Sequence, residues 1–491
     1  MSRIARASLI IAFFFGVDKI LGLLRQILFN RQFGPVERDI FFVSNNIPDL
    51  LSALISGGAL GIALIPVLTE HLQEKDRQDA WRLFSRILNL AFLVTAGISL
   101  VIIALADPLI RFVIAPGFAD PSKWTLTASL MRLDMFAILI FSISGLVMAG
   151  LQANQHFLTP AMAPAMYNLG QIIGITLLSR WFGIYGMVFG VILGASLHLG
   201  IQIPALIRYG YRWRPIIGLS DPGVRQVLVL LGPRVLSMLC LHFYFLARDR
   251  FASYYQEGGV SALNNGWFIM QLPETLIGTA IAIAMLPSLA EYVTRGEEQV
   301  FRQTINRALR AMLALTLPAA AILGVCIRPL IQIVFDFGLQ ETEMVVWTTR
   351  AFLLGLVGHS WLEVGVRSWY AKQNARIPLL GAVFQIGLYL PMAIILSQAT
   401  GLPGLALADT LAFTSQALLL LILLNQRHPG ILRVQGTLLR ASLSALLGGV
   451  LAFAVLQRSL PVIPALGLAL AVGGLAALPL ILPEIKMLIK L

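Results

Sequence analysis

The chain alternates between long apolar stretches and short polar connections along its whole length. About 20 apolar residues in a helix span the roughly 30 Å hydrocarbon core of a bilayer, and windows of that length recur from end to end. The pattern therefore predicts an all-α, polytopic membrane protein with about 14 transmembrane helices. The predicted helices are 7–30, 39–68, 86–106, 126–154, 157–180, 183–207, 224–254, 262–290, 304–327, 344–371, 377–398, 402–425, 436–457 and 461–482.

The positions of Lys and Arg predict the orientation of these helices. Alternate connections are rich in both residues, and by the positive-inside rule these connections are cytoplasmic. Both termini are then cytoplasmic, as an even number of helices requires. The cytoplasmic set is Arg3 and Arg6; Lys75, Arg77, Arg82 and Arg86; Arg208, Arg212, Arg214 and Arg225; Arg295, Arg302, Arg307 and Arg310; Lys372 and Arg376; Arg427, Arg433 and Arg440; Lys486 and Lys490.

Composition agrees with a chain that lies mostly in lipid. Hydrophobic residues make up 58% and charged residues 12% of the sequence, and the mean hydropathy is +0.82. The net charge of +12 reflects the loop bias and an attraction to anionic membrane lipids, so we expect no nucleic-acid partner.

Asp18 and Lys19 interrupt the first apolar run, which predicts a retained helix instead of a cleaved signal peptide. Cys240 and Cys326 lie in predicted helices without metal-ligand spacing, so we expect them to pack and to bind no metal.

An internal repeat is visible at an offset of 221 residues, as between Gly57 and Gly278. The same offset relates Pro108 to Pro329 and Gln152 to Gln373. A duplicated unit of six helices would insert twice with the same orientation, giving two parallel lobes with a substrate path between them. A duplicated bundle without a path is the alternative. The predicted domains are an N-lobe (1–207), a cytoplasmic linker (208–223), a C-lobe (224–425), and helices 13 and 14 outside the repeat (426–491).

Glycines in the sixth predicted helix, Gly186, Gly190 and Gly194, recur every four residues. This spacing places them in one stripe, which is typical of close helix packing in membranes.

The sequence contains no motif of a known catalytic centre, and its loops are too short to form a soluble catalytic domain, so we expect no enzyme activity.

Charges inside apolar windows are costly and by default face a cavity. The first helix carries Asp18, Lys19, Arg25 and Arg31, and Asp39 follows near the start of the second. Asp18, Gly22, Arg25 and Phe29 share one face. Cationic groups with spare donors suit a pyrophosphate, whereas a pair of Asp18 with Arg25 or Lys19 that only pins helices is the alternative.

Several stretches resemble motifs of the MurJ (MviN) family, within the multidrug/oligosaccharidyl-lipid/polysaccharide exporter superfamily. They are DKILGLLRQILFNRQFG (18–34), IPDLL (47–51), ALIPVLTE (63–70), APGFAD (115–120), QANQHFLTPAMAP (152–164), LLGPRVL (230–236), LPSLAEY (286–292) and YAKQNARIP (370–378). The resemblance covers about residues 5–430 and implies a lobed fold with a central cavity and a groove for a polyprenyl tail. It implies export of lipid II, a lipid-linked oligosaccharide pyrophosphate, across the bacterial cytoplasmic membrane by alternating access. The substrate-binding residues would be Asp18, Lys19, Arg25, Arg31 and Asp39.

The resemblance further implies a monomer without a cofactor, with the machinery of cell-wall synthesis as a candidate partner.

The chain departs from the family pattern at several charged positions. Lys19 stands where an Arg is usual, and Ser52, Ala53 and Gly57 replace two Arg and a Glu. Trp267 and Phe268 replace an Asp-Arg pair. These losses leave open an exporter of another undecaprenyl-linked saccharide, a multidrug or small-molecule antiporter, or a membrane scaffold.

The coupling ion is open between Na⁺ and H⁺. Some relatives bind sodium between the seventh, eleventh and twelfth helices, which implies a site of Asp249, Gln385, Asp409 and Thr410, with Tyr389 one turn from Gln385. Oxygen donors of this kind suit a hard cation. The alternative is that Asp249 pairs with Arg248 or Arg250 and that Asp409 packs or titrates with protons.

Overall fold

The computed structural model describes residues 3–55, 59–74 and 77–488, and in these residues all regular structure is helical. The predicted all-α membrane fold is therefore confirmed. Gly57, Lys75 and Lys490 lie outside the described residues, as do the side chains of Arg3 and Arg6. The chain forms two compact units, which meet in sequence between Tyr254 and Tyr255.

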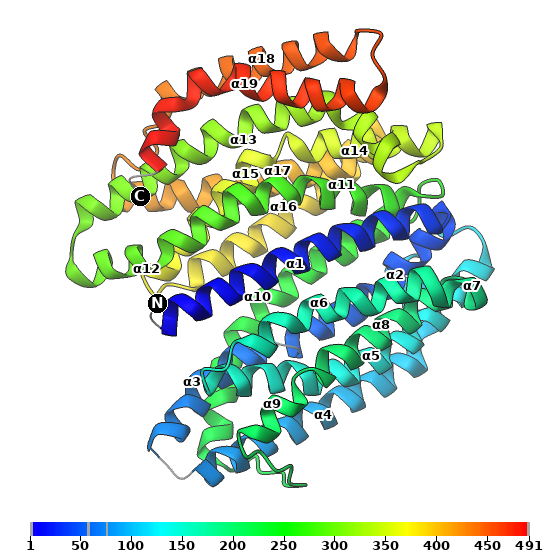
Figure 1. Ribbon diagram of the computed structural model, residues 1–491, viewed down its shortest axis with the longest axis vertical. Helices are drawn as coiled ribbons and strands as arrows, with labels where there is room; N and C mark the ends of the chain where they lie inside the picture. The colour runs from blue at the N-terminus through cyan, green and yellow to red at the C-terminus, as the bar shows by residue number, and fades with distance from the viewer. Residues whose placement is uncertain (1–2, 56–58, 75–76, 489–491) are drawn as a thin grey trace. The chain divides into compact units, whose positions relative to one another are not determined.

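Helices form both units, as Figure 1 shows by colour along the chain. The first unit contains α1 (Arg3–Gln32), α2 (Pro35–Ile55), α3 (Ala59–Glu74), α4 (Arg77–Pro108), α5 (Pro121–Ala153), α6 (Leu158–Ile173), α7 (Ser179–Phe182), α8 (Ile184–Gly200), α9 (Ile203–Arg208) and α10 (Pro222–Ala252). The second contains α11 (Gly259–Glu274), α12 (Ala280–Arg295), α13 (Glu298–Phe335), α14 (Leu339–Leu353), α15 (Leu356–Ala371), α16 (Arg376–Thr400), α17 (Leu402–Arg427), α18 (Gln435–Leu456) and α19 (Val462–Leu488). Three π-helical turns, Leu109–Ile114, Gly174–Leu178 and Thr275–Thr279, continue α4, α6 and α11.

Ten of the described helical segments are long and apolar enough to cross a membrane. They correspond to ten of the predicted spans, and the chain is a multi-pass membrane protein. The other four predicted spans are α1, α2 with α3, α10, and α14 with α15. Charged residues or breaks interrupt their apolar runs, and three of them supply residues to the polar cluster described below.

The ends of the helices repeat between the two units. α3 and α12 begin and end 221 residues apart, and so do the helical segments 77–114 and 298–335. From the next segment onward the offset is 218, as between 121–153 and 339–371 and between 158–182 and 376–400. Three residues are therefore missing from the second copy of the loop that precedes Leu339. This matching of lengths is expected of a duplicated unit.

The change of offset corrects one predicted equivalence. Gln155 and Gln373 have φ of 57° and 56°, and each ends its helix with the same pair of backbone hydrogen bonds. The structural counterpart of Gln373 is therefore Gln155, and the predicted pairing with Gln152 is three residues out of register. Gly183 and Gly401, also 218 apart, both combine a positive φ with ψ near −140° (−135° and −146°), a conformation essentially restricted to glycine.

Helix packing also repeats. In the first unit α4 contacts α5, α5 contacts α8, and α6 contacts α8; in the second α13 contacts α14, α14 contacts α17, and α16 contacts α17. The seventh predicted span, α10, packs on α2 and α3, so contacts assign it to the first unit. The boundary between the compact units thus follows α10, whereas the expected linker, 208–223, precedes it.

The glycine stripe lies in the contact between α6 and α8. A Cβ added to Gly174 would lie 2.5 Å from the Cα of Gly190, and one added to Gly194 would lie 2.5 Å from the carbonyl oxygen of Tyr167. Side chains at these positions would force the helices apart. The predicted packing role of the stripe is confirmed.

The last two helices of the second unit pack on α13, and Figure 1 shows α18 and α19 running side by side along it. Glu484 of α19 is fully buried and accepts hydrogen bonds from Arg310 of α13 and from Thr437 and Arg440 of α18. This carboxylate ties the two helices outside the repeat to the helix bundle.

Candidate substrate and ion sites

A polar ladder joins α1 to α6 inside the first unit. Asn168 donates a 2.8 Å hydrogen bond to the Asp18 carboxylate, and Arg25 donates one of 3.2 Å to the side-chain oxygen of Gln171. Gly22 lies between them and faces Asn168. The predicted common face of Asp18, Gly22 and Arg25 is confirmed. The two charges bond to neutral amides of α6 and not to each other.

The other predicted substrate residues lie at different places on α1 and α2. Lys19 is exposed, with its ammonium 5.0 Å from the centroid of the Phe15 ring, and Arg31 is also exposed. Asp39 is buried on α2, next to the buried Arg38. Arg38 donates to the Asn30 side chain and so links α2 to α1. A role of Lys19, Arg31 and Asp39 in substrate binding stays a prediction.

Several acidic groups interact with Arg25 or with its neighbour Asp49 in the first unit. The charge of Arg25 acts on Asp49 of α2 and on Tyr167 of α6, and Asp249 of α10 also acts on Asp49. Asp49 in turn acts on Asp134, which is buried in α5. We call Arg25, Asp49, Asp134, Tyr167 and Asp249 the polar cluster.

Sequence reasoning missed Asp134 and the two amides on α6 that bond to Asp18 and Arg25. Asp134 is a lone acid in the apolar stretch MRLDMFAILIF, and Asn168 and Gln171 are one helical turn apart in α6. Polar residues at such positions were a usable signal, because they are costly in lipid unless they have a function or a partner.

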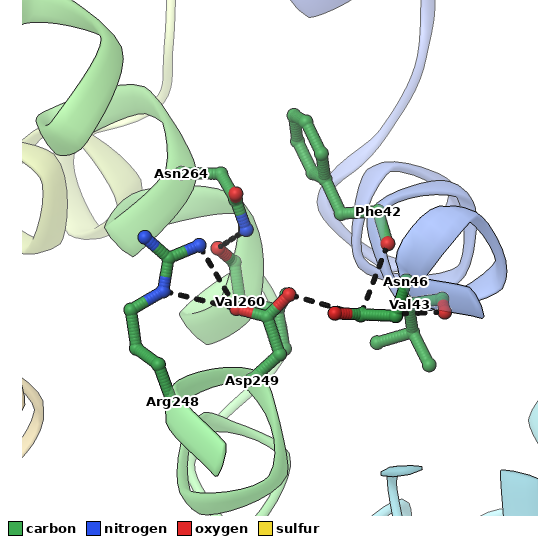
Figure 2. A network of polar contacts seen from close by, with 7 residues as sticks. All are labelled: Phe42, Val43, Asn46, Arg248, Asp249, Val260 and Asn264. Carbon is green, nitrogen blue, oxygen red and sulfur yellow. Dashed lines mark hydrogen bonds and ion pairs between the residues drawn. The ribbon is translucent and has the colours of Figure 1, made fainter. Parts of the chain in front are cut away.

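Asp249 is held on both sides. One oxygen accepts hydrogen bonds of 3.1 and 3.0 Å from the Arg248 guanidinium, and the other accepts one of 3.1 Å from Asn46 of α2, as Figure 2 shows. Both acid and base are buried. The alternative expectation that Asp249 pairs with Arg248 is confirmed, whereas Arg250 donates to backbone oxygens of Phe112 and Val113.

The remaining predicted ion ligands lie in the second unit. Asp409 is fully buried and lies 3.1 Å from Nε2 of His359, a partner that sequence reasoning missed. Thr410 donates to the carbonyl oxygen of Ala351, and Gln385 is buried. Each of these groups is within a membrane helix, but a sodium site shared with Asp249 stays a prediction.

Aromatic residues surround His359. The centroid of the Trp267 ring lies 5.2 Å from that of His359 and 5.6 Å from that of Phe352. The ring centroids of Phe413 and His359 are 4.4 Å apart. Trp267 is one of the residues that replace the expected charged pair. Aromatic contacts are therefore made at a position where the family resemblance implies a charged residue.

An apolar cavity of about 790 Å³ lies in the second unit between α13, α14 and α17. Leu317, Ala320, Leu354 and Leu407 are among its lining residues, and Trp347 and Arg350 form part of its wall. Such a lining suits hydrocarbon.

Comparison with known proteins places these features in a family. The family model described as lipid II flippase MurJ matches residues 33–473. A probable lipid II flippase MurJ of Bdellovibrio bacteriovorus is 29% identical over 440 residues, covering 88% of this chain and 84% of the relative. The lipid II flippase MurJ of Burkholderia cenocepacia is 27% identical over 461 residues, covering 89% and 88%.

Solved structures agree in fold. A lipid II flippase MurJ in an inward closed conformation superposes with a TM-score of 0.83 at 22% identity and covers 96% of this chain and 98% of that one. An inward-facing multidrug resistance transporter of the MATE family, described as a member of the MOP superfamily, gives a TM-score of 0.74 at 14% identity, covering 84% of this chain and 95% of that one. The family-model match spans most of the sequence, and the chain belongs to the lipid II flippase MurJ family.

Proposed function

We propose that this chain translocates lipid II across the bacterial cytoplasmic membrane by alternating access. It would act as a monomer with both termini cytoplasmic, in contact with cell-wall synthesis, and would catalyse no chemical reaction. The observation that carries the proposal is Arg25, a cation inside the membrane part of the first unit whose hydrogen-bond partner among the described residues is the neutral Gln171.

Arg25 retains the capacity to bind an anion. A guanidinium has five N–H donors, and the bond to Gln171 uses one. The spare donors match the oxygens of a pyrophosphate, and such charge-assisted bonds are about twice as strong as neutral ones. The apolar cavity beside α13 is suited to part of a polyprenyl tail.

A second candidate is export of another undecaprenyl-linked saccharide. The observation that favours it is Trp267, which packs on His359 and Phe352 at a position where the family resemblance implies charge. Ser52 and Ala53 also lack the expected cations. An aromatic surface would contact sugar rings differently from an ion pair, and this could change the glycan that is accepted.

Complementation of a strain depleted of its lipid II flippase tests the proposal. The wild-type chain is expected to restore growth, and Arg25→Ala to abolish the rescue at an equal amount of membrane-inserted protein. The matched control is Arg82→Ala, because Arg82 is exposed and pairs only locally with Asp79. Rescue by Arg25→Ala would remove Arg25 from the mechanism. If the wild-type chain fails while a reconstituted assay moves a different undecaprenyl-linked glycan, the second candidate is favoured.

A further inference from the structure

Asp134 is a buried acid of the first unit that has no hydrogen-bond partner among the described residues. It lies in the middle of α5 with 1% of its surface exposed, and neither carboxylate oxygen has a hydrogen-bond partner among the described residues. Asp249, which is similarly buried at 3% exposed, has its oxygens filled by Arg248 and Asn46. Both acids are therefore buried, but the oxygens of Asp249 accept hydrogen bonds and those of Asp134 accept none from the described residues.

The neighbours of Asp134 supply no compensating cation. From α2 the charge of Asp49 acts on it, and from α6 Tyr167 is close enough to interact with it. Both are acids.

The remaining helices that pack on α5 bring their ionisable groups to other residues. Asp107 of α4 pairs with Arg132, and Arg111 lies over Trp124. His198 of α8 bonds to Ser144, and α3 meets α5 near Gly145 and Ala149. In the described part of the chain, the charge that acts on Asp134 is the negative charge of Asp49, and no cation acts on it.

An ionised carboxylate in this place would lack both a hydrogen bond and a cation, which is costly in a low-dielectric interior. A second negative charge, on Asp49, increases that cost. Two neighbouring carboxylates that cannot both ionise retain a proton on one of them. Asp134 is the acid on which no cation acts among the described residues, whereas Asp49 lies within the field of Arg25, which favours its ionised form.

We propose that Asp134 is a proton-binding site, and that its proton and an anion on Arg25 bind cooperatively. The inference rests on the proposed function for the identity of the anion, a pyrophosphate. Protonation removes one negative charge from the polar cluster, so the positive potential at Arg25 increases. By linkage, a bound anion favours the proton on Asp134 to the same extent.

The first experiment needs no substrate. Infrared spectra of the purified protein at neutral pH are expected to contain a band of a protonated carboxyl that Asp134→Asn removes and Asp107→Asn keeps. Asn mimics the protonated acid in shape, so Asp134→Asn is expected to fold. Asp107 is the control because it is an exposed acid paired with Arg132. A spectrum in which Asp134→Asn changes no protonated-carboxyl band would overturn the proposal.

The second experiment measures binding of a short polyprenyl pyrophosphate in detergent as a function of pH. Affinity for the wild-type chain is expected to fall with rising pH by up to about tenfold per pH unit, the limit for one linked proton. Asp134→Asn is expected to retain high affinity with only the pH dependence of the probe itself, and Asp107→Asn to behave as wild type. Equal pH dependence in all three proteins would refute the linkage.

Calorimetry in buffers of different ionisation enthalpy gives the same information from the wild-type chain alone. Net proton uptake by the protein on binding the probe is expected, and none would contradict the proposal. Affinity that follows Na⁺ at fixed pH and is lost in Asp134→Asn would assign the site to sodium instead. A failure of lipid II transport with an intact infrared signal would reject the proposed substrate but not the proton site.

Discussion

Arg25 and Gln171 are 146 residues apart in sequence and share a hydrogen bond from the guanidinium to the side-chain oxygen. Gln171→Glu would place a carboxylate on Arg25 at this distance, and it would then compete with any anionic ligand. We expect about a tenfold loss of affinity for a polyprenyl pyrophosphate, consistent with a charged hydrogen bond of about 1.5 kcal/mol. Gln171→Met, which adds no charge, is the control and should lose much less affinity. Equal losses in both variants would mean that the amide itself holds the ligand.

The left-handed conformations of Gln155 and Gln373 are unfavourable for residues with a side chain. Gln155→Gly and Gln373→Gly should each stabilise the protein by up to about 1 kcal/mol, because glycine adopts a positive φ without strain. Thermal unfolding in detergent would measure this. Gln152→Gly, within the last turn of α5, is the control and should destabilise. Lower stability of both left-handed variants would show that the side chains contribute more than the strain costs.

Close contact between Gly174 and Gly190 makes the α6–α8 interface sensitive to size. Gly190→Ala should destabilise the first unit by about 1–3 kcal/mol, because the added methyl meets backbone. Gly97→Ala is the matched control, since open space surrounds Gly97 in α4. The yield of monodisperse protein and its unfolding temperature would test the difference. An unchanged Gly190→Ala protein would show that the helices separate at little cost.

Asp120 makes the start of α5 sensitive to acid. Its carboxylate accepts from the Ser122 backbone, and hydrogen bonding to Ser122 holds the pKa of Asp120 below its usual value. A lowered folded-state pKa means that the cap stabilises α5 above the unfolded value of about 3.9, and that this contribution is lost as the pH falls through the folded value. The protection of the Ser122 and Lys123 amides against hydrogen exchange, measured relative to the intrinsic rate at each pH, should therefore decrease in acid. Asp120→Asn keeps a cap that does not titrate, so its exchange should lack this transition.

Matching helix ends predict that the two units superpose. Residues 59–114 should fit onto 280–335 at an offset of 221, and residues 121–182 onto 339–400 at an offset of 218. An experimental structure in lipid would test the fit and the parallel orientation. Copies that cross the membrane in opposite directions would contradict the predicted parallel repeat.

The apolar windows were predictable because lipid requires long runs of nonpolar side chains, but the helix ends were not. α4 begins at Arg77, nine residues before its predicted start at 86, because a helix continues past the lipid wherever polar residues can be solvated. The break between α14 and α15, at Leu354 and Gly355, is likewise invisible in hydropathy.

The candidate site was predictable only along single helices. Spacing placed Asp18 and Arg25 on one face, since a face is a local property of a helix. Their partners Asn168 and Gln171, and the pairing of Asp409 with His359, depend on how distant helices pack. The sequence did not reveal the change of offset from 221 to 218, because Gln stands at both 152 and 155. Gln373 therefore matches a Gln at either offset, and the match at 221 gave the wrong equivalence.

Glu484 has a consequence for how the chain is made. Arg310 and Arg440 are synthesised 174 and 44 residues before the carboxylate that they share. Until α19 has been translated, both arginines are therefore at the membrane without the Glu484 carboxylate. Glu484 of α19 then pairs with both arginines and links α13 to α18, so the second unit reaches its final packing only after α19 has been made. A nascent chain that stalls before α19 would therefore hold two arginines at the membrane without the carboxylate that they share in the folded protein.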